Sequence, residues 1–268
     1  MDMTFLYGTA WKEEDTRRCV ADALAVGFRA IDTANQRRHY HEAGVGEAVA
    51  AFLAEQPRES LFLQSKFTYR RGQDHRLPYD PDAPLPEQVQ QSVESSLGHL
   101  HTTYLDALLL HGPATREGLT GDDWAVWQTM ESLHAAGVVR QIGISNVRSE
   151  QLQALLEGAR VAPAFVQNRC YARDGWDASV RSVCREAGVV YQGFSLLTAN
   201  RKTWGHATTA AIAQAHEATP AQVVFQCAAQ MGILPITGTT QRVHMVQDLE
   251  SRALVLTDEE VEAVIRLE

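Results

Sequence analysis

Short apolar segments alternate with longer amphipathic segments along the whole chain, and this alternation restricts the possible folds more than any other feature. Apolar and β-branched runs of strand length occur at Thr4–Gly8, Phe28–Asp32, Leu61–Lys66, Tyr104–His111, Val139–Ser145, Ala164–Asn168, Val189–Phe194 and Ile233–Ile236. Apolar residues spaced three to four apart predict intervening helices, as at Asp15–Ala25, Glu87–Leu100, Asp122–Ala136 and Val180–Ala187. Such a chain belongs to the α/β class.

The number of strand–helix units favours a closed barrel. Eight units within 268 residues, with no linker or low-complexity stretch between them, are typical of a (β/α)8 TIM barrel, here a single domain over residues 1–268. A doubly wound open sheet is the main alternative. In a barrel, functional side chains lie where each strand runs into its following helix.

Composition and charge exclude several functions. Lys and Arg number 24 against 33 Asp and Glu, a net charge of −9, and no basic run offers a surface for nucleic acid. No apolar run is long enough to cross a membrane, and the N-terminus lacks the pattern of a secretion signal. Neither the cysteines nor the histidines show metal-ligand spacing. We expect a soluble, cytoplasmic protein, monomeric by default, that binds no metal, nucleic acid or membrane.

Polar residues gather at the predicted carboxyl ends of the strands. Asp32 ends the second strand and is followed by Tyr40, Lys66 ends the third strand, and His111 ends the fourth. The later strands end in Ser145-Asn146, Gln167-Asn168, Phe194-Ser195 and Thr237-Gly238. Taken singly, Asp32 could cap a helix, Lys66 could form an ion pair, Tyr40 could pack in a loop and His111 could belong to the core. Their joint placement favours a functional site.

Aspartate, tyrosine, lysine and histidine together suit proton transfer to or from an oxygen atom. A tyrosine ordinarily has a pKa near 10, too high for easy acid–base chemistry at neutral pH. A nearby ammonium lowers that pKa by stabilising the phenolate, and a carboxylate behind the ammonium keeps it charged and oriented. A neutral imidazole can hydrogen-bond the substrate oxygen. None of these groups donates a hydride, so a redox reaction requires a nicotinamide cofactor.

Five segments, in order along the chain, resemble the aldo-keto reductase family: FRAIDTA, LFLQSK, YLDALLLHGP, VVRQIGISN and TPAQVVFQCAAQMGILPITGTT. The resemblance implies a (β/α)8 barrel that reduces an aldehyde or ketone with NADP(H), or catalyses the reverse oxidation. It implies that Tyr40 is the general acid, Lys66 the neighbour that lowers its pKa, Asp32 the partner of Lys66, and His111 the group that orients the substrate.

The resemblance also implies a cofactor site along the later strands. Ser145, Asn146 and Gln167 would hold the nicotinamide carboxamide. Phe194 would stack on the nicotinamide ring in place of the family's tyrosine, and Ser195 with the following backbone would approach the pyrophosphate.

Three departures from the family modify these expectations. Seven residues, Thr33–His39, stand where the family has four, and Tyr40 is chosen because YHEAGVG resembles the family's tyrosine, glutamate and glycine run. The family's Lys-Ser after the last strand is Ile236-Thr237 here, followed by Gly238 and Thr239, so Arg242 or His244 would replace the lysine at the 2′-phosphate. NADP(H) is therefore favoured while NAD(H) stays open. The family's N-terminal hairpin and longer C-terminal loop lack counterparts, which predicts an open substrate mouth.

The substrate pocket and two rival functions complete the expectations. A small carbonyl compound would meet aromatic walls drawn from Trp11, Phe67, Tyr69 and Tyr171, with Trp124 and Trp204 as further candidates. Gly44-Val45-Gly46 lacks the third glycine of a dinucleotide fingerprint and predicts close helix packing instead. One rival is a cofactor-binding regulatory barrel with little turnover. The other is a lyase or aldolase that uses Lys66 as a Schiff-base nucleophile.

Overall fold

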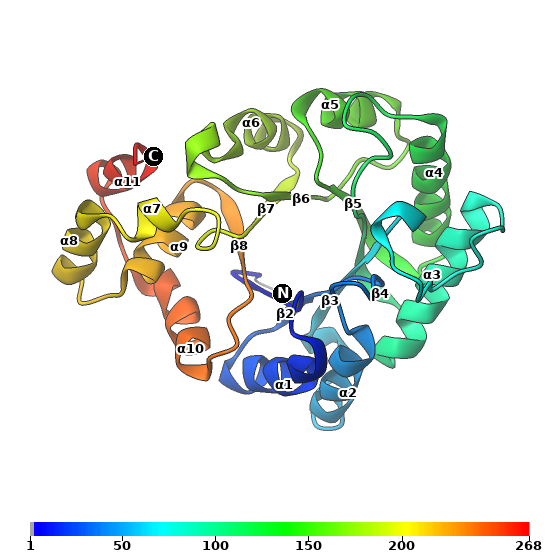
Figure 1. Ribbon diagram of the computed structural model, residues 1–268, viewed down its shortest axis with the longest axis horizontal. Coiled ribbons are helices and arrows are strands. Elements are labelled where there is room, and N and C mark those ends of the chain that lie inside the picture. Colours follow the sequence, from blue (N-terminus) through cyan, green and yellow to red (C-terminus); the bar gives the residue numbers. More distant parts are fainter. Residues whose placement is uncertain (1–2, 268) are drawn as a thin grey trace.

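Eight parallel strands close into a barrel inside a ring of helices in the computed structural model, which describes residues 3–267 (Figure 1). Neighbouring strands follow chain order, and β1 pairs with β8 to close the ring, with Tyr7 opposite Thr237. The strands are β1 Leu6–Gly8, β2 Ala30–Asp32, β3 Phe62–Phe67, β4 Leu105–Leu110, β5 Val139–Ser145, β6 Phe165–Arg169, β7 Val190–Phe194 and β8 Ile233–Thr237. The predicted (β/α)8 barrel is confirmed.

Three of the helices begin at a threonine that caps their first turn. Thr120, Thr219 and Thr257 cap α4, α9 and α11 by accepting a hydrogen bond from the backbone three residues on. The α-helices are α1 Thr16–Val26, α2 Glu42–Leu53, α3 Leu85–Leu100, α4 Gly121–Ala135, α5 Ser149–Gly158, α6 Ala178–Ala187, α7 Arg201–Trp204, α8 Ala207–Ala215, α9 Pro220–Gln230, α10 Arg242–Glu250 and α11 Asp258–Ile265. Shorter 3-10 helices lie at Glu13–Asp15, Arg58–Ser60, Arg70–Gly72, Ala172–Asp177 and Ser251–Ala253. Within residues 3–267 no helix has the length and apolar character needed to span a membrane.

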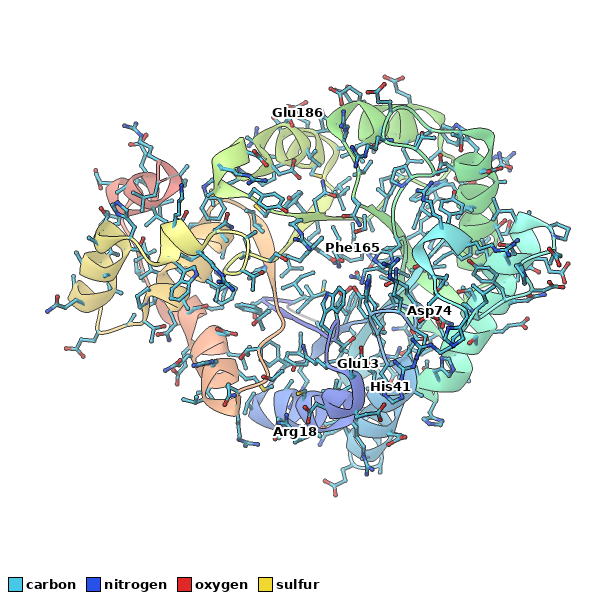
Figure 2. The ribbon with its side chains drawn as sticks, viewed as in Figure 1. Glu13, Arg18, His41, Asp74, Phe165 and Glu186 are labelled. Atoms are coloured by element: carbon cyan, nitrogen blue, oxygen red, sulfur yellow. The ribbon has the colours of Figure 1, made fainter. Side chains whose placement is uncertain are left out.

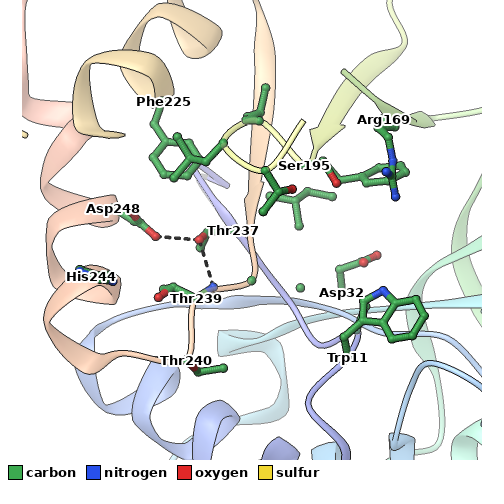
Figure 3. A pocket seen from close by; sticks show the side chains of 18 of the residues that line it. Trp11, Asp32, Arg169, Ser195, Phe225, Thr237, Thr239, Thr240, His244 and Asp248 are labelled. Atoms are coloured by element: carbon green, nitrogen blue, oxygen red, sulfur yellow. Dashed lines mark hydrogen bonds between the residues drawn. The ribbon is translucent and has the colours of Figure 1, made fainter. Parts of the chain in front are cut away.

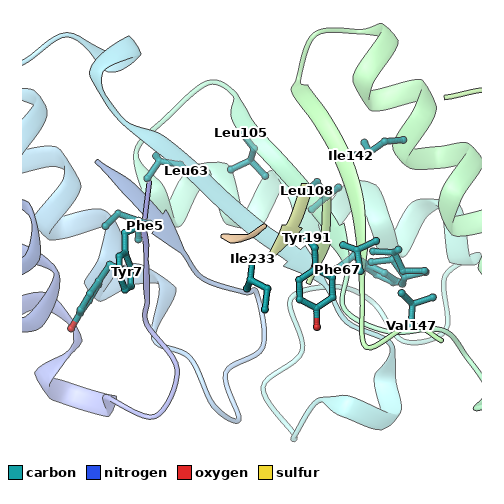
Figure 4. Close-up of a cluster of buried hydrophobic side chains, with 14 of the residues drawn as sticks. Phe5, Tyr7, Leu63, Phe67, Leu105, Leu108, Ile142, Val147, Tyr191 and Ile233 are labelled. Atoms are coloured by element: carbon teal, nitrogen blue, oxygen red, sulfur yellow. The ribbon is translucent and has the colours of Figure 1, made fainter. Parts of the chain in front are cut away.

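Strand side chains alternate between two apolar layers. On β4, Leu108 and Leu110 join the larger cluster between strands and helices, part of which Figure 4 shows. Ala107 and Leu109 join the smaller cluster inside the barrel. Phe165 points into the ring of strands, while charged side chains such as Glu186 lie on the outside (Figure 2). The barrel interior is therefore packed, and it leaves space for a ligand only at its end.

Helices α2 and α3 approach each other closely at Gly46. A Cβ atom added there would lie 1.7 Å from the backbone oxygen of His99, near the end of α3. The Gly44-Val45-Gly46 run thus lies inside α2 and permits helix packing, as its sequence predicts. No side chain larger than hydrogen fits at Gly46 without separating the two helices.

Replacing Gly46 with alanine should lower the free energy of unfolding by about 1–3 kcal/mol, because a backbone atom of α3 must move. Gly98→Ala is the matched control: it lies within α3 with no atom within 4 Å of the added Cβ. That substitution should stabilise the protein by about 0.5–1 kcal/mol through its better helix propensity. Urea unfolding of both variants measures the two changes, and a Gly46→Ala protein as stable as the parent would contradict the close approach.

Candidate active site

A cavity of about 830 Å³ opens at the carboxyl ends of the strands, a volume typical of small-molecule sites (Figure 3). Its wall is built from the carboxyl ends of the strands and the segments that follow them, and only β3 contributes no residue. Of the residues predicted from sequence, the cavity brings together Trp11, Asp32, Tyr40, His111, Ser145, Asn146, Gln167, Phe194, Ser195, Thr237, Gly238, Thr239 and His244.

Asp32 is the centre of a buried hydrogen-bond network beneath the cavity. Its Oδ1 accepts hydrogen bonds from Lys66 Nζ at 2.6 Å, Gln64 Nε2 at 2.6 Å and Gln167 Nε2 at 2.9 Å. Gln64 and Lys66 are two residues apart on β3, so both point into the barrel. Gln64 and Gln192 also exchange amide hydrogen bonds at 2.8 and 3.0 Å across the interior. Every polar group of this layer is therefore oriented by another.

The Lys66 side chain is fully buried and does not line the cavity. Its Nζ donates to Asp32 and to the backbone oxygen of Thr33 at 2.8 Å. Burial lowers the pKa of the Lys66 ammonium, and the Asp32 carboxylate opposes that change. A Schiff-base nucleophile must be reached by its carbonyl substrate. The buried position of Lys66 therefore disfavours the aldolase alternative.

Tyr40 and His111 lie together above the buried pair. Lys66 Nζ is 5.3 Å from the centroid of the Tyr40 ring, and the Tyr40 and His111 ring centroids are 6.0 Å apart at 71°. The longer segment before Tyr40 thus delivers this tyrosine to the other three groups. Arg37 would take the tyrosine's place if only the family's four residues followed Asp32, but it points instead toward Glu13 and Glu14 at 3.6 and 3.8 Å.

The acid–base properties of Tyr40 differ from the expectation that Lys66 lowers its pKa. Burial raises the pKa of Tyr40 above its ordinary value, and the Asp32 carboxylate raises it further. The reason is geometric, because Lys66 faces the ring of Tyr40 and is paired with Asp32. Tyr40 is therefore a protonated phenol at neutral pH, which is the state required of a proton donor.

His111 is held as a neutral imidazole at the cavity wall. Its Nδ1 lies 2.7 Å from the Thr68 hydroxyl oxygen, which fixes the ring orientation. Burial, followed by the positive charge of Lys66, lowers the pKa of His111 to about 3. A neutral imidazole can donate one hydrogen bond to an uncharged oxygen without adding a positive charge to the site.

Two strand ends turn polar groups toward the cavity through an uncommon backbone. Asn146 and Ser195, which follow β5 and β7, have φ of 54° and 59°, values in the left-handed region. Asn146 Nδ2 donates to the backbone oxygen of His111 at 2.7 Å and to Ser145 Oγ at 3.2 Å. Between residues 3 and 267, no protein donor bonds Asn146 Oδ1 or Gln167 Oε1. Both amide oxygens therefore remain available to a ligand.

The loop after β8 lines the opposite end of the cavity. Thr237 Oγ1 donates to Asp248 Oδ2 at 2.7 Å (Figure 3), and Lys12 Nζ donates to the backbone oxygen of Gly238 at 2.8 Å. Burial lowers the pKa of Lys12 to about 8 and raises the pKa of Asp248 to about 6. Sequence analysis missed both residues. Lys12 directly follows Trp11 after β1, so the strand-end rule could have found it, whereas Asp248 lies deep in α10 and carries no such signal.

Besides Lys66, five residues predicted for the pocket or the cofactor do not line the cavity and are corrected. One is Trp124, whose ring packs at Gly158 against the outer core. Phe67 is fully buried in the outer core, because alternation along β3 turns it away from the barrel interior. Tyr69 donates to Asp123 Oδ1 at 2.9 Å, outside the cavity. Tyr171 lies against Arg173, whose guanidinium is 4.7 Å from its ring centroid. Arg242 points to Asp22 at 3.5 Å on the surface, so it does not face the loop after β8.

One stretch of chain supplies much of the remaining wall. Trp204, one of the aromatic candidates, lines the cavity from α7. Residues without a sequence signal also contribute: Arg169, Leu196, Leu197, Thr198, Thr219, Pro220, Ala221, Phe225 and Gln247. Most of these lie between residues 195 and 225, and the helices α7 to α9 bring them to the rim.

The barrel and its cavity define a class of protein. Tyr40, His111 and the Lys66–Asp32 pair at one end, beside free amide oxygens and the Phe194 ring, fit an oxidoreductase that acts on a carbonyl group with a nicotinamide cofactor. The sequence matches the model of the Aldo/keto reductase family over residues 3–268, and the chain belongs to this family. It is thus an aldo-keto reductase, whose reaction is carbonyl reduction.

Known relatives resemble almost the whole chain. Deoxymugineic acid synthase 1 of Oryza sativa subsp. japonica is 30% identical over 272 residues, covering 93% of this chain and 80% of that protein. An aldo-keto reductase of Mycobacterium sp. (strain MCS) is 30% identical over 249 residues, covering 93% and 81%. The structure of a Bombyx mori aldo-keto reductase in complex with NADP has a TM-score of 0.80 and 22% identity, covering 98% of this chain and 88% of that one.

The neutral state of His111 can be measured by NMR of histidine-labelled protein. Because its folded pKa is about 3 and an unfolded histidine titrates near 6.5, the His111 ring should show no titration between pH 5 and 8. Between these two pKa values the unfolded state binds a proton at His111 and the folded state does not. The free energy of unfolding therefore keeps its full value from His111 above pH 6.5 and loses it as the pH falls toward 3. His111→Gln assigns the resonance by its disappearance. A midpoint near 6.5 in the folded protein would contradict the buried, neutral ring.

Proposed function

We propose that this protein reduces a small aldehyde or ketone to an alcohol with NADPH, and that Tyr40 supplies the proton. The same groups would serve the reverse oxidation. The observation that carries the proposal is the convergence of Tyr40, His111 and the Lys66–Asp32 pair at one end of a cavity about 830 Å³ in volume. A regulatory barrel with little turnover would not need a protonated phenol beside a neutral imidazole.

The remaining wall fits a nicotinamide dinucleotide. Asn146 Oδ1 and Gln167 Oε1 are free acceptors for the two hydrogens of a carboxamide, and Ser145 holds Asn146 in place. Phe194 presents an aromatic ring, and the loops at 195–198 and 237–240 present backbone and hydroxyl groups suited to phosphates. When bound, the cofactor supplies the hydride.

The chain's own groups manage the substrate oxygen. Tyr40 is protonated at neutral pH and can donate to the oxygen as negative charge develops there. When the Thr68 hydroxyl donates to Nδ1 of His111, Nε2 keeps the hydrogen that can bond the same oxygen. The Lys66 ammonium, 5.3 Å from the Tyr40 ring centroid, offsets only part of the cost that burial and the Asp32 carboxylate impose on the phenolate left after proton transfer. Asp32 and the surrounding glutamine amides hold that ammonium in position.

The preference for NADPH rests on two nitrogen-bearing side chains beside the loop after β8. Lys12 contacts this loop through Gly238, and His244 lines the cavity from α10. These two groups, in place of the family's lysine and of Arg242, are the available partners for a 2′-phosphate. The Bombyx mori relative whose structure contains NADP supports the same choice.

Tyr40→Phe should lower kcat for carbonyl reduction by about 10²–10⁴-fold, the contribution expected of a general acid. The dissociation constant of NADPH should change little, because phenylalanine keeps the ring that faces Lys66 and His111. Steady-state kinetics with an aromatic aldehyde and fluorescence titration with NADPH give the two readouts. Undiminished turnover would show that another group, such as His39, is the proton donor.

Titration with NADPH and NADH tests the cofactor preference. Trp11 and Trp204 both line the cavity, so cofactor binding should quench tryptophan fluorescence. A charge-assisted phosphate contact contributes about 1.5–3 kcal/mol, so NADPH should bind roughly tenfold or more tightly than NADH. Lys12→Met and His244→Gln, each tested alone, identify the residue responsible. Equal or tighter binding of NADH would retain the reductase and contradict the NADPH preference.

A further inference from the structure

Arg169 is a cavity residue that the reaction described above does not use. It is the last residue of β6 and lies two positions after Gln167, whose side chain reaches Asp32 inside the barrel. Side chains two apart on a strand share one face, so Arg169 also points inward, one step nearer the mouth. Figure 3 shows Arg169 and Trp11 on opposite sides of the space above Asp32. Arg169 is therefore placed over the catalytic end of the cavity.

The Arg169 side chain is exposed, and its guanidinium lies beside an aromatic ring. Arg169 pairs with Phe194 in the β6–β7 register, and its guanidinium carbon lies 5.5 Å from the centroid of the Phe194 ring. This is a distance at which an arginine is attracted to the face of a ring. A strand terminus and an adjacent aromatic ring together place a cation at the cavity wall.

No acidic side chain neutralises Arg169. In the part of the chain that the structure describes, no carboxylate lies within 4.0 Å of its guanidinium, and its one side-chain hydrogen bond runs to the Tyr171 hydroxyl at 3.5 Å. Arg173, four residues later, instead lies 3.7 Å from Asp174. Arg169 thus keeps its charge available at a ligand cavity, in a chain whose net charge is −9.

The other charged side chains of the cavity, within the described residues, do not neutralise the positive charge of Arg169. Asp32 is paired with Lys66, and Asp248 lies at the far end against Thr237. Lys12, the other full cation of the wall, is bound to the loop after β8. Near Tyr40 and His111, Arg169 is therefore the group that would attract an anion entering from solvent.

We propose that Arg169 binds an anionic group on the carbonyl substrate, so that the preferred substrates are aldehydes or ketones that also carry a carboxylate or phosphate. Arginine presents two parallel N–H donors that match either anion. This inference rests on the proposed carbonyl reduction and adds the substrate class. The same chemistry could serve the cofactor pyrophosphate, and the experiment separates these two sources.

The test compares two aldehydes of similar size, 4-carboxybenzaldehyde and its neutral amide 4-carbamoylbenzaldehyde, with NADPH. In Arg169→Met, the ratio of kcat/KM for the carboxylate to that for the amide should fall by about 10–100-fold, the worth of a hydrogen bond to a charged group. Arg169→Lys should restore part of that ratio, because it keeps the charge and loses the paired donors. Arg173→Met is the control: it removes the same charge outside the cavity and should leave the ratio unchanged.

Two results would overturn the inference. A ratio unchanged in Arg169→Met would show that Arg169 does not contact the substrate anion. A changed dissociation constant for NADPH, in either direction, with both aldehydes affected alike, would assign Arg169 to the cofactor.

If the parent protein reduces neither aldehyde, the proposed function fails by itself. The anion preference is then measured by binding of benzoate against benzamide, followed by tryptophan fluorescence, and equal binding of the two would overturn it.

Discussion

The ion pair between Asp32 and Lys66 is the interaction on which the rest of this site depends. Burying two charges inside a barrel is costly unless each is paired and hydrogen-bonded, and here Oδ1 of Asp32 accepts three donors while Lys66 also donates to Thr33. The donors come from β3 and β6, and the amide exchange of Gln64 with Gln192 adds β7. One buried carboxylate thereby fixes the relative positions of several strands and of the groups above them.

This network also explains how the residues at the catalytic end of the cavity can be both polar and rigid. Gln167 uses its amide hydrogens inside the barrel and keeps its oxygen for the cavity, so one side chain belongs to the core and to the ligand wall. Tyr40 and His111 rest on this layer and are held in the neutral state by burial. The protein thus buries the Asp32–Lys66 charges below the site and presents uncharged donors to the carbonyl oxygen of a substrate.

Much of the fold and half of the site follow from a single rule about parallel barrels. Because all strands run the same way, their carboxyl ends share one rim, so Asp32, His111, Asn146 and Gln167 could be grouped from sequence alone. Alternation along β3 would also have excluded Phe67, since Lys66 points inward and its neighbour must point outward.

The remaining residues could not be predicted because their directions depend on distant partners. Arg242 turns toward Asp22, which is 220 residues away, and Tyr69 turns toward Asp123 in the first turn of α4. The pKa of Tyr40 is set by burial, a property of the folded chain that residue types do not report. Tyr40 itself was found through its flanking residues, although the length of the segment before it argued for another register.

The continuous segment from Ser195 to Phe225 supplies one side of the cavity, while the strand ends before it carry the groups that handle the carbonyl oxygen. Helices α7 and α8 and the start of α9 belong to that segment and lie outside the barrel network centred on Asp32. Substitutions there can alter which bulky substituent fits, and they leave the proton-transfer groups undisturbed. Evolution can therefore reshape this side of the cavity without changing the catalytic power of the barrel, because the two traits reside in different stretches of the gene.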